Sequence, residues 1–284
     1  LGDVYKRQEE DHDFSQPGDT VFSMLGILDK VQDVVEKGVL LGELRGDLVK
    51  PDPFVGTSSA WVDLTRFENL ENATFNRYRD YYAIVNNCNF YLERADAEME
   101  RRGQKVFLKE YAAVSAYRAW AYLQLALLYG EVPFYTQPLL SYSEIEQVMN
   151  DPSKRKGLGE ICSYFIDDLL PYVDVPFPNY GNFTYDQSSS VNSSDFFLPI
   201  RLLRGDLYLW RGSLDGNKSD FAKAAQEYRD YLLSEKRFVS PDVKVAYRTV
   251  DMDGAQIVDR WSSVFLGNNY NESISLVPFA GNSQ

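Results

Sequence analysis

The sequence predicts a mostly all-α protein, in which antiparallel helical hairpins alternate with long loops and a small strand element lies near the C-terminus. Apolar residues recur at helical spacing along most of the 284-residue chain. One stretch, 107–129, is apolar on nearly every side, which is typical of a helix packed among other helices. Short turns join two pairs of expected helices, and a short turn forces its two helices to lie side by side.

The segment 107–129 is the helix around which we expect the fold to be organised. Gly130 follows directly, as glycine often does past a helix C-terminus, and Pro133 prevents the helix from resuming. A membrane span is disfavoured because Arg118 and Gln124 lie inside the stretch, and an arginine at mid-bilayer costs roughly 2.5–3.5 kcal/mol. We therefore expect a buried core helix, with Arg118 as a paired structural charge.

Apolar periodicity predicts the other helices in chain order. The first begins with Thr20 as N-cap and ends at Gly38, and a short, ambiguous segment follows at 61–72. The full set of expected helices is 20–38, 73–102, 107–129, 144–150, 158–173, 196–212 and 219–236.

The connections between these helices are expected to be irregular apart from one strand. The longest loop, 176–195, is rich in Pro, Asn, Ser and aromatic residues. Residues 273–279 alternate apolar and polar side chains as a strand does. Ser219 or Asp220 is expected to cap the last helix.

Two helix pairs give the expected architecture. Helix 73–102 precedes 107–129 across Gly103, and 196–212 precedes 219–236. This arrangement is typical of tetratricopeptide-like hairpins, although the strict repeat consensus is absent.

Composition excludes several classes of function. The net charge of −13 and the lack of a basic run argue against binding to nucleic acid or to an anionic membrane surface. His12 is the one histidine, which leaves little room for histidine-based catalysis or metal binding. We expect Cys88 and Cys162 to be small buried side chains, and a disulfide between them stays open.

Motifs that suggest catalysis or a cofactor fail on closer reading. Residues 215–220 resemble the start of a calcium loop, but Asp220 stands where glycine is needed and Gln226 where glutamate is needed. The acid pairs Glu43 with Asp47 and Asp167 with Asp168 do not suggest a glycosidase site by spacing alone. We therefore expect no catalytic residues, no metal site and no cofactor.

Several segments together resemble the SusD/RagB family. The strongest is an alanine-rich helix with a central Arg-Ala that leads into Tyr-Gly-Glu-Val-Pro, and the others follow in the family's order. The matching segments are 110–134, 44–47, 82–89, 201–209 and 272–274, within a resemblance that covers Val21 to Phe279.

The resemblance implies a non-enzymatic, surface-exposed lipoprotein of a Bacteroidetes-type outer membrane. Such proteins capture oligosaccharides or other nutrients and deliver them to a TonB-dependent, SusC-like transporter. The family's lipid-anchor cysteine is absent here, and family members are considerably longer. We therefore expect 1–19 to be a disordered or artefactual segment and 20–284 to be a SusD-like helical domain that is truncated at its C-terminus.

Aromatic side chains outside helices are the candidate ligand contacts, because sugars stack their C–H faces on flat rings beside amide groups. The candidates are Trp61, expected in a non-helical region, and Tyr180, Phe183 and Tyr185 in the loop 176–195. The alternative, that these rings pack back onto the core, stays open. Two other functions also stay open: a tetratricopeptide-like scaffold for a protein or peptide, and an α-helical glycosidase.

Overall fold

The computed structural model confirms a mostly helical protein. It describes residues 14, 17–46, 51, 59–69, 77–184 and 190–234. These residues group into two compact units, one ending at Pro178 and the other beginning at Asn179. The predicted strand 273–279 lies outside the described residues.

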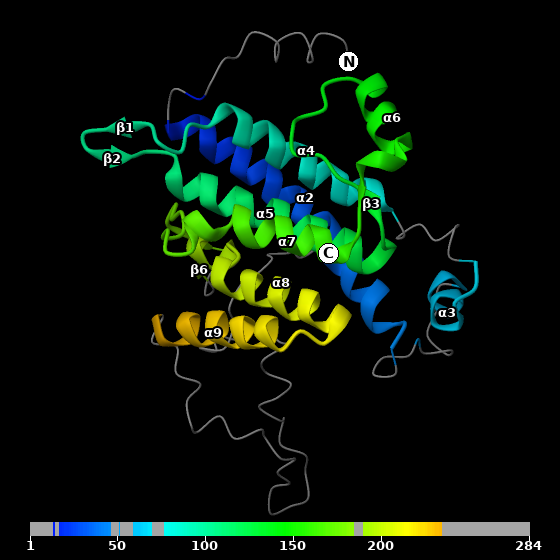
Figure 1. Ribbon diagram of the computed structural model, residues 1–284. Coiled ribbons are helices and arrows are strands. Elements are labelled where there is room, and N and C mark those ends of the chain that lie inside the picture. Colours follow the sequence, from blue (N-terminus) through cyan, green and yellow to red (C-terminus); the bar gives the residue numbers. More distant parts are fainter. Residues whose placement is uncertain are drawn as a thin grey trace, which may run out of the picture. The chain divides into compact units, whose positions relative to one another are not determined.

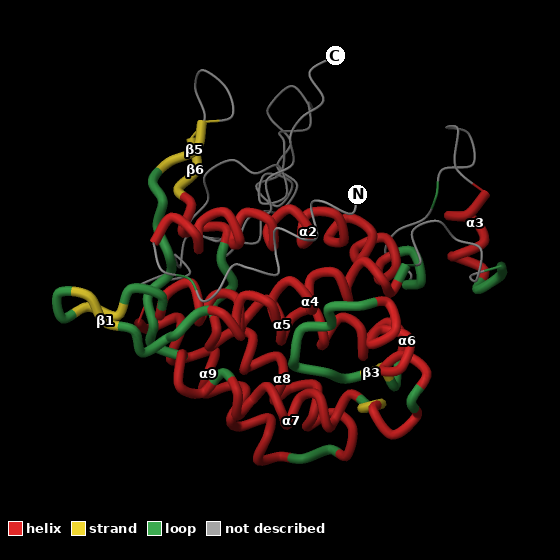
Figure 2. Tube along the Cα trace, turned by 90° about the horizontal axis from the view of Figure 1, so that it is seen from above, coloured by secondary structure: helices red, strands yellow, loops and turns green. Residues whose placement is uncertain are grey.

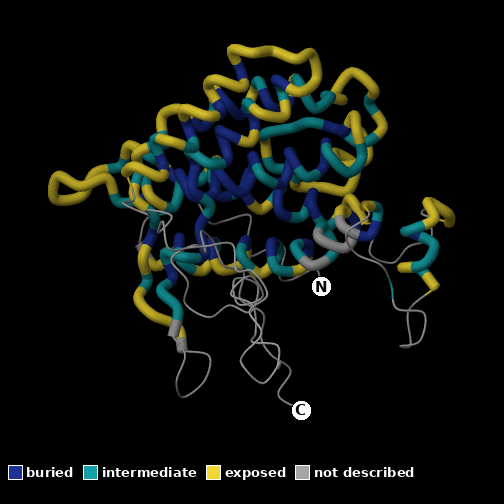
Figure 3. Tube along the Cα trace, turned by 90° about the horizontal axis from the view of Figure 1, so that it is seen from below, coloured by how far each residue is buried: buried dark blue, intermediate teal, exposed yellow. Residues whose placement is uncertain are grey.

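The first unit is built on three long helices: α2 (Pro17–Glu43), α4 (Tyr78–Arg94) and α5 (Leu108–Tyr129). Figure 1 shows α5 beside α4, with α2 and α7 (Leu158–Asp168) also packed against it. Every residue of α5 from Ala112 to Ala119 is buried, as the all-round apolar pattern predicted. Figure 3 shows buried residues concentrated along these central helices.

Helix α5 ends as predicted. Gly130 adopts a φ of 76°, a conformation that glycine reaches without a Cβ clash, and its N–H donates to the carbonyl of Ala126. No helix in the described part of the chain is long and apolar enough to cross a bilayer.

Helix α2 extends past both of its predicted ends. Pro17 begins the helix, because proline suits the first helical turn, so Thr20 is a buried helical residue and not a cap. Gly38 lies inside the helix, where an added Cβ would be 3.0 Å from the Tyr81 hydroxyl of α4. Because glycine has no side chain, α2 can pack close to α4 at this position.

Helix α4 is shorter than predicted, because a β-hairpin replaces its expected last two turns. Strands β1 (Glu100–Arg101) and β2 (Gln104–Lys105) pair antiparallel. Arg102 and Gly103, with φ of 52° and 74°, form a two-residue turn of the kind that joins hairpin strands. The hairpin is exposed along its length (Figure 3).

After α5 the chain forms a long connection whose first and last residues pair as two short strands. Strand β3 (Val132–Pro133) pairs antiparallel with β4 (Arg155–Lys156). Between them lie α6 (Tyr142–Asn150) and the 3₁₀ turn η2 (Pro152–Lys154), so the predicted helix 144–150 is confirmed and is slightly longer. The predicted helix 158–173 is divided into α7 and the 3₁₀ turn η3 (Leu170–Tyr172).

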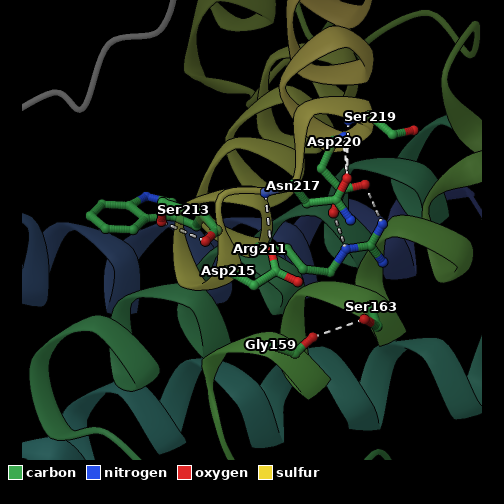
Figure 4. Close-up of polar contacts among 9 residues, drawn as sticks. Gly159, Ser163, Arg211, Ser213, Asp215, Asn217, Ser219 and Asp220 are labelled. Carbon is green, nitrogen blue, oxygen red and sulfur yellow. Dashed lines mark hydrogen bonds and ion pairs between the residues drawn. The ribbon is translucent and has the colours of Figure 1, made fainter.

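The second unit contains the second predicted hairpin. Helix α8 (Ile200–Asp215) packs against α9 (Lys218–Ser234), and both helices begin and end near their predicted bounds. The predicted cap is wrong: Asn217 Oδ1 accepts the N–H groups of Ser219 and Asp220 at 3.0 and 3.4 Å. Figure 4 shows this cap at the start of α9.

Candidate ligand-binding site

The segment predicted as one long loop, 176–195, contains a β-hairpin. Strands β5 (Asn182–Thr184) and β6 (Ser190–Asn192) pair antiparallel, with Phe183 opposite Val191 (Figure 2). The 3₁₀ turn η4 (Ser193–Phe196) then leads to α8. Thr and Val favour pleated strands, so the prediction of an open loop gave too much weight to the turn-forming residues around them.

Neutral polar side chains hold this hairpin in place. Ser193 Oγ accepts the N–H of Tyr180 at 2.6 Å, and the N–H of Ser193 donates to the carbonyl of Gly181 at 2.9 Å. Asn192 donates from its side-chain amide to Asn182 Oδ1 at 2.8 Å. The base of the hairpin is therefore fixed by hydrogen bonds on both strands.

Two of the four predicted ligand contacts lie on this hairpin. Phe183 packs on Phe196 with ring centroids 5.7 Å apart and stays 40% exposed. Tyr180 packs edge-on against Phe197 at 6.3 Å and is half-buried. Phe183 therefore presents a ring to solvent, whereas Tyr180 partly serves the packing of its own unit.

Of the other two predicted contacts, one belongs to the first unit and one lies outside the described residues. Trp61 is not in a loop: it lies in α3 (Ser59–Arg66), which belongs to the first unit, and it is 37% exposed. Leu64 of the same helix is buried in a cluster with Leu41 and Leu44. This apolar contact stabilises the helix. Tyr185 lies outside the described residues.

The described hairpin residues, 179–184 and 190–194, include no Asp, Glu, Lys or Arg. The amide nitrogen of Asn182 donates to none of the described residues, because only its oxygen is engaged. Asn182 and Phe183 are consecutive strand residues, so their side chains point to opposite faces of the hairpin. The exposed ring of Phe183 by itself suits a ligand that offers C–H faces.

A second aromatic group, which the sequence did not reveal as a unit, joins α4 and α5 to the segment that follows α5. Tyr122 Oη donates to the carbonyl of Tyr135 at 2.6 Å and accepts the same residue's N–H at 2.9 Å. Tyr82 stacks on Tyr135 and donates to the carbonyl of Pro133 at 2.7 Å. These rings are buried or partly buried and pin the segment after Gly130, so they form architecture and not an open platform.

The calcium-like sequence at 215–220 is a helix connection (Figure 4). Asp215 accepts the N–H of Asn217 at 3.1 Å, while Arg211 donates to both oxygens of Asp220 at 2.7 and 2.8 Å. The hydrogen bonds from Arg211 lower the pKa of Asp220. The part of the chain that the structure describes contains no cluster of three or more metal-ligating side chains.

The other chemical candidates are occupied or buried. Asp168 pairs with Arg118 of α5 at 3.1 Å. Its carboxylate is therefore engaged and does not form a pair of catalytic acids with the neighbouring Asp167. Cys88 and Cys162 are both buried, as the sequence predicted, and they form no disulfide with each other. Burial raises the pKa of the Cys88 thiol to about 12, which makes it a poor nucleophile.

Comparisons with known proteins identify the fold. No family model matches the chain, and no curated protein matches it in sequence. A SusD superfamily protein from Bacteroides vulgatus is 18% identical, with a TM-score of 0.58 over 76% of this chain and 42% of that one. NanU of B. fragilis is 17% identical, with a TM-score of 0.55 over 78% of this chain and 42% of that one.

A SusD superfamily protein from Bacteroides thetaiotaomicron gives the same result, with 18% identity and a TM-score of 0.55 over 77% of this chain and 47% of that one. The chain therefore has the fold of SusD superfamily proteins and spans less than half the length of these three structures. The fold class that the sequence resemblance implied is confirmed.

Proposed function

We propose that this chain, which has the SusD-type fold, is the N-terminal part of a SusD/RagB-family nutrient-binding protein. In this proposal residues 20–284 belong to one SusD-like region that continues beyond the sequence. The protein binds an oligosaccharide at the bacterial cell surface, held at the outer membrane by a lipid anchor, and passes it to a TonB-dependent SusC-like transporter. It performs no catalysis.

The observation that carries the proposal is the SusD-type fold, and the β5–β6 hairpin supplies the contact. Phe183 offers an exposed ring on this hairpin. We propose that the bound nutrient is an oligosaccharide, because sugars stack their C–H faces on aromatic rings. Tyr180, Tyr185 and Trp61 remain proposed contacts.

A binding measurement with the full-length protein tests this site. A glycan array first identifies a bound oligosaccharide, and calorimetry then compares the protein with its Phe183→Ala variant. We expect about tenfold weaker binding, because one lost aromatic contact is worth about 1.4 kcal/mol at the upper end of its range. Phe22→Ala, at a residue that is 79% exposed on α2, is the matched control and should bind normally.

Equal affinity of the Phe183→Ala variant would remove the hairpin from the site, and an array with no bound glycan would argue against the function itself. The scaffold alternative would then gain weight. It is favoured by the apolar side chains that α8 exposes, since Leu209, Trp210 and Leu214 are 44%, 42% and 57% exposed. A tetratricopeptide-like helix pair with such a face could bind a peptide.

A further inference from the structure

Two buried tyrosine hydroxyls in the first unit have no hydrogen-bond partner among the described residues. Tyr81 of α4 is 2% exposed, and Tyr129 is the last residue of α5. Both Oη atoms are shielded from solvent, and no described group donates to them or accepts from them. A buried hydroxyl that gives up its hydrogen bonds to water without replacing them destabilises the fold, so nearly every such group in a native protein is paired.

The two hydroxyls belong to one junction, where α2, α4 and the end of α5 meet. The Tyr81 side chain reaches α2, since a Cβ added at Gly38 would lie 3.0 Å from its hydroxyl. The Tyr129 ring packs edge-on against the ring of Tyr78, three residues before Tyr81 on α4, with centroids 6.1 Å apart. Figures 1 and 2 both show the three helices packed alongside one another.

The junction is polar. Lys37 of α2 and Asp80 of α4 form an ion pair at 3.2 Å. Burial is the main cause that raises the pKa of Tyr81 and of Tyr129. The phenol of Tyr129 also raises the pKa of Tyr81, and Asp80 raises both, so these groups lie within electrostatic reach of one another.

The junction also has space beside one of the hydroxyls. Besides the backbone of α2 and the residues adjacent to Gly38, the Tyr81 hydroxyl is the only described atom within 4 Å of a Cβ added at that glycine. No described side chain therefore fills the position next to the hydroxyl on the α2 side.

Water is the ligand that these groups fit. A phenol can donate one hydrogen bond and accept another, and a buried water forms two to four bonds with such polar partners. Both phenols are uncharged at neutral pH because their pKa values are raised, so they offer dipoles and not a charge that would hold an ion. An apolar ligand would leave both hydroxyls unpaired.

We propose that ordered water occupies this junction and bridges the hydroxyls of Tyr81 and Tyr129. Solvent is then part of the contact by which α2 and α4 hold the end of α5, directly before Gly130. Such a bridge is sound in energy, because a water-mediated hydrogen bond is nearly as favourable in enthalpy as a direct one. The inference is independent of the nutrient that the protein binds.

A double-mutant cycle in the full-length protein tests the bridge. Tyr81→Phe, Tyr129→Phe and the double variant keep the rings and remove only the hydroxyls. We expect each single variant to lower the folding equilibrium constant about threefold to tenfold in urea denaturation. The double variant should lose clearly less than the product of the two single effects, because both hydroxyls share one water. Tyr78→Phe, at a tyrosine of the same helix that is 53% exposed, is the matched control and should be as stable as the parent protein.

Hydroxyls that are buried without any partner give the opposite sign. Removing either one would then leave stability unchanged or raise it, and that result would overturn the proposal. Losses that multiply without coupling would also overturn the bridge. A crystal structure of the full-length protein provides an independent readout, in which we expect density for a water within hydrogen-bond distance of both hydroxyls. A direct bond from either hydroxyl to a protein group in its place would contradict the inference.

Discussion

Arg118 is a buried charge in the central helix, and its contacts define its role. Its guanidinium donates to Asn89 Oδ1 and to Asp168 Oδ2, both at 3.1 Å, while its side chain is 8% exposed. The sequence predicted a paired structural charge, and this prediction is confirmed. Asn89 also donates to the carbonyls of Tyr135 and Gln137, so the arginine supports the segment that leads to α6.

Gly205 of α8 lies directly against the ring of Tyr228 of α9. A Cβ at this position would lie 2.6 Å from Cδ1 and 2.8 Å from Cζ of the Tyr228 ring. The ring cannot turn away freely, because the Tyr228 hydroxyl donates to Asp206 at 2.6 Å. We expect Gly205→Ala to lower the free energy of unfolding by about 1–3 kcal/mol through overpacking, as measured by urea denaturation.

Gly26 supplies the control for this prediction. It lies inside α2 with no atom within 4 Å of an added Cβ, so Gly26→Ala should be neutral or stabilise by up to about 1 kcal/mol. Adding Tyr228→Ala to Gly205→Ala should recover part of the overpacking cost. A Gly205→Ala protein as stable as its parent would show that the two helices can separate without loss.

At the scale of elements, the segment after α5 depends on side chains of α4 and α5 for its backbone hydrogen bonds. Tyr122→Phe would leave the part-buried N–H of Tyr135 without its acceptor, and the carbonyl of Tyr135 would keep only the hydrogen bond from Asn89 at 3.4 Å. We expect a loss of about 1–3 kcal/mol in stability. Hydrogen exchange at the amide of Tyr135 should become faster by a similar free energy.

The amide of Leu139 is the internal control, because Asn86 and not Tyr122 accepts its hydrogen bond. Its exchange should change less than that of Tyr135 in the Tyr122→Phe protein, and the reverse should hold in Asn86→Ala. Equal acceleration at both amides would mean that the segment opens as one unit.

The sequence predicted elements well where apolar periodicity and a breaker coincide. Helix α5 has both, since its apolar faces run directly into Gly130. The sequence-based prediction was wrong at the end of α4, because residues 96–102 are rich in helix-forming residues and yet are not helical. There Asp96 accepts the N–H of Glu98 at 2.8 Å and supports a turn, and the pairing of β1 with β2 decides the outcome.

The candidate site was predictable in composition but not in geometry. The sequence predicts Phe183 in a loop, whereas the structure places it on a strand with an exposed ring. Trp61 was misplaced, because its α-helix is stabilised by Leu64, whose partners Leu41 and Leu44 are far away in sequence. Periodicity over so short a segment does not report such long-range contacts.

At the scale of the whole molecule, buried phenols and a buried thiol link stability to alkaline pH. An exposed tyrosine has a pKa of about 10. Burial raises the pKa of Tyr129 and of Tyr172 to about 12. It raises the pKa values of Tyr82 and Tyr117 further. The folded protein therefore holds these protons more tightly than the unfolded chain does.

The sign of the effect follows from this difference. A raised folded pKa gives stability that is complete below the unfolded pKa and is lost as pH rises above it. We expect the free energy of unfolding to change little from these groups between pH 7 and about 8. Above about pH 10 it should fall, by up to about 1.4 kcal/mol per pH unit for the fully buried Tyr117 and by less for the partly exposed Tyr129 and Tyr172. Urea denaturation at a series of pH values measures this slope, and a flat profile up to pH 11 would contradict it.

The turn between α8 and α9 has a consequence for the order in which the chain folds. Only Gly216 and Asn217 separate the two helices, so their contacts join residues close in sequence and closing the loop loses little entropy. The packing of α2 on α4, by contrast, joins helices with more than thirty residues between Glu43 and Tyr78. Because local contacts form faster than distant ones, we expect the α8–α9 hairpin to form before the long-range contacts of the first unit.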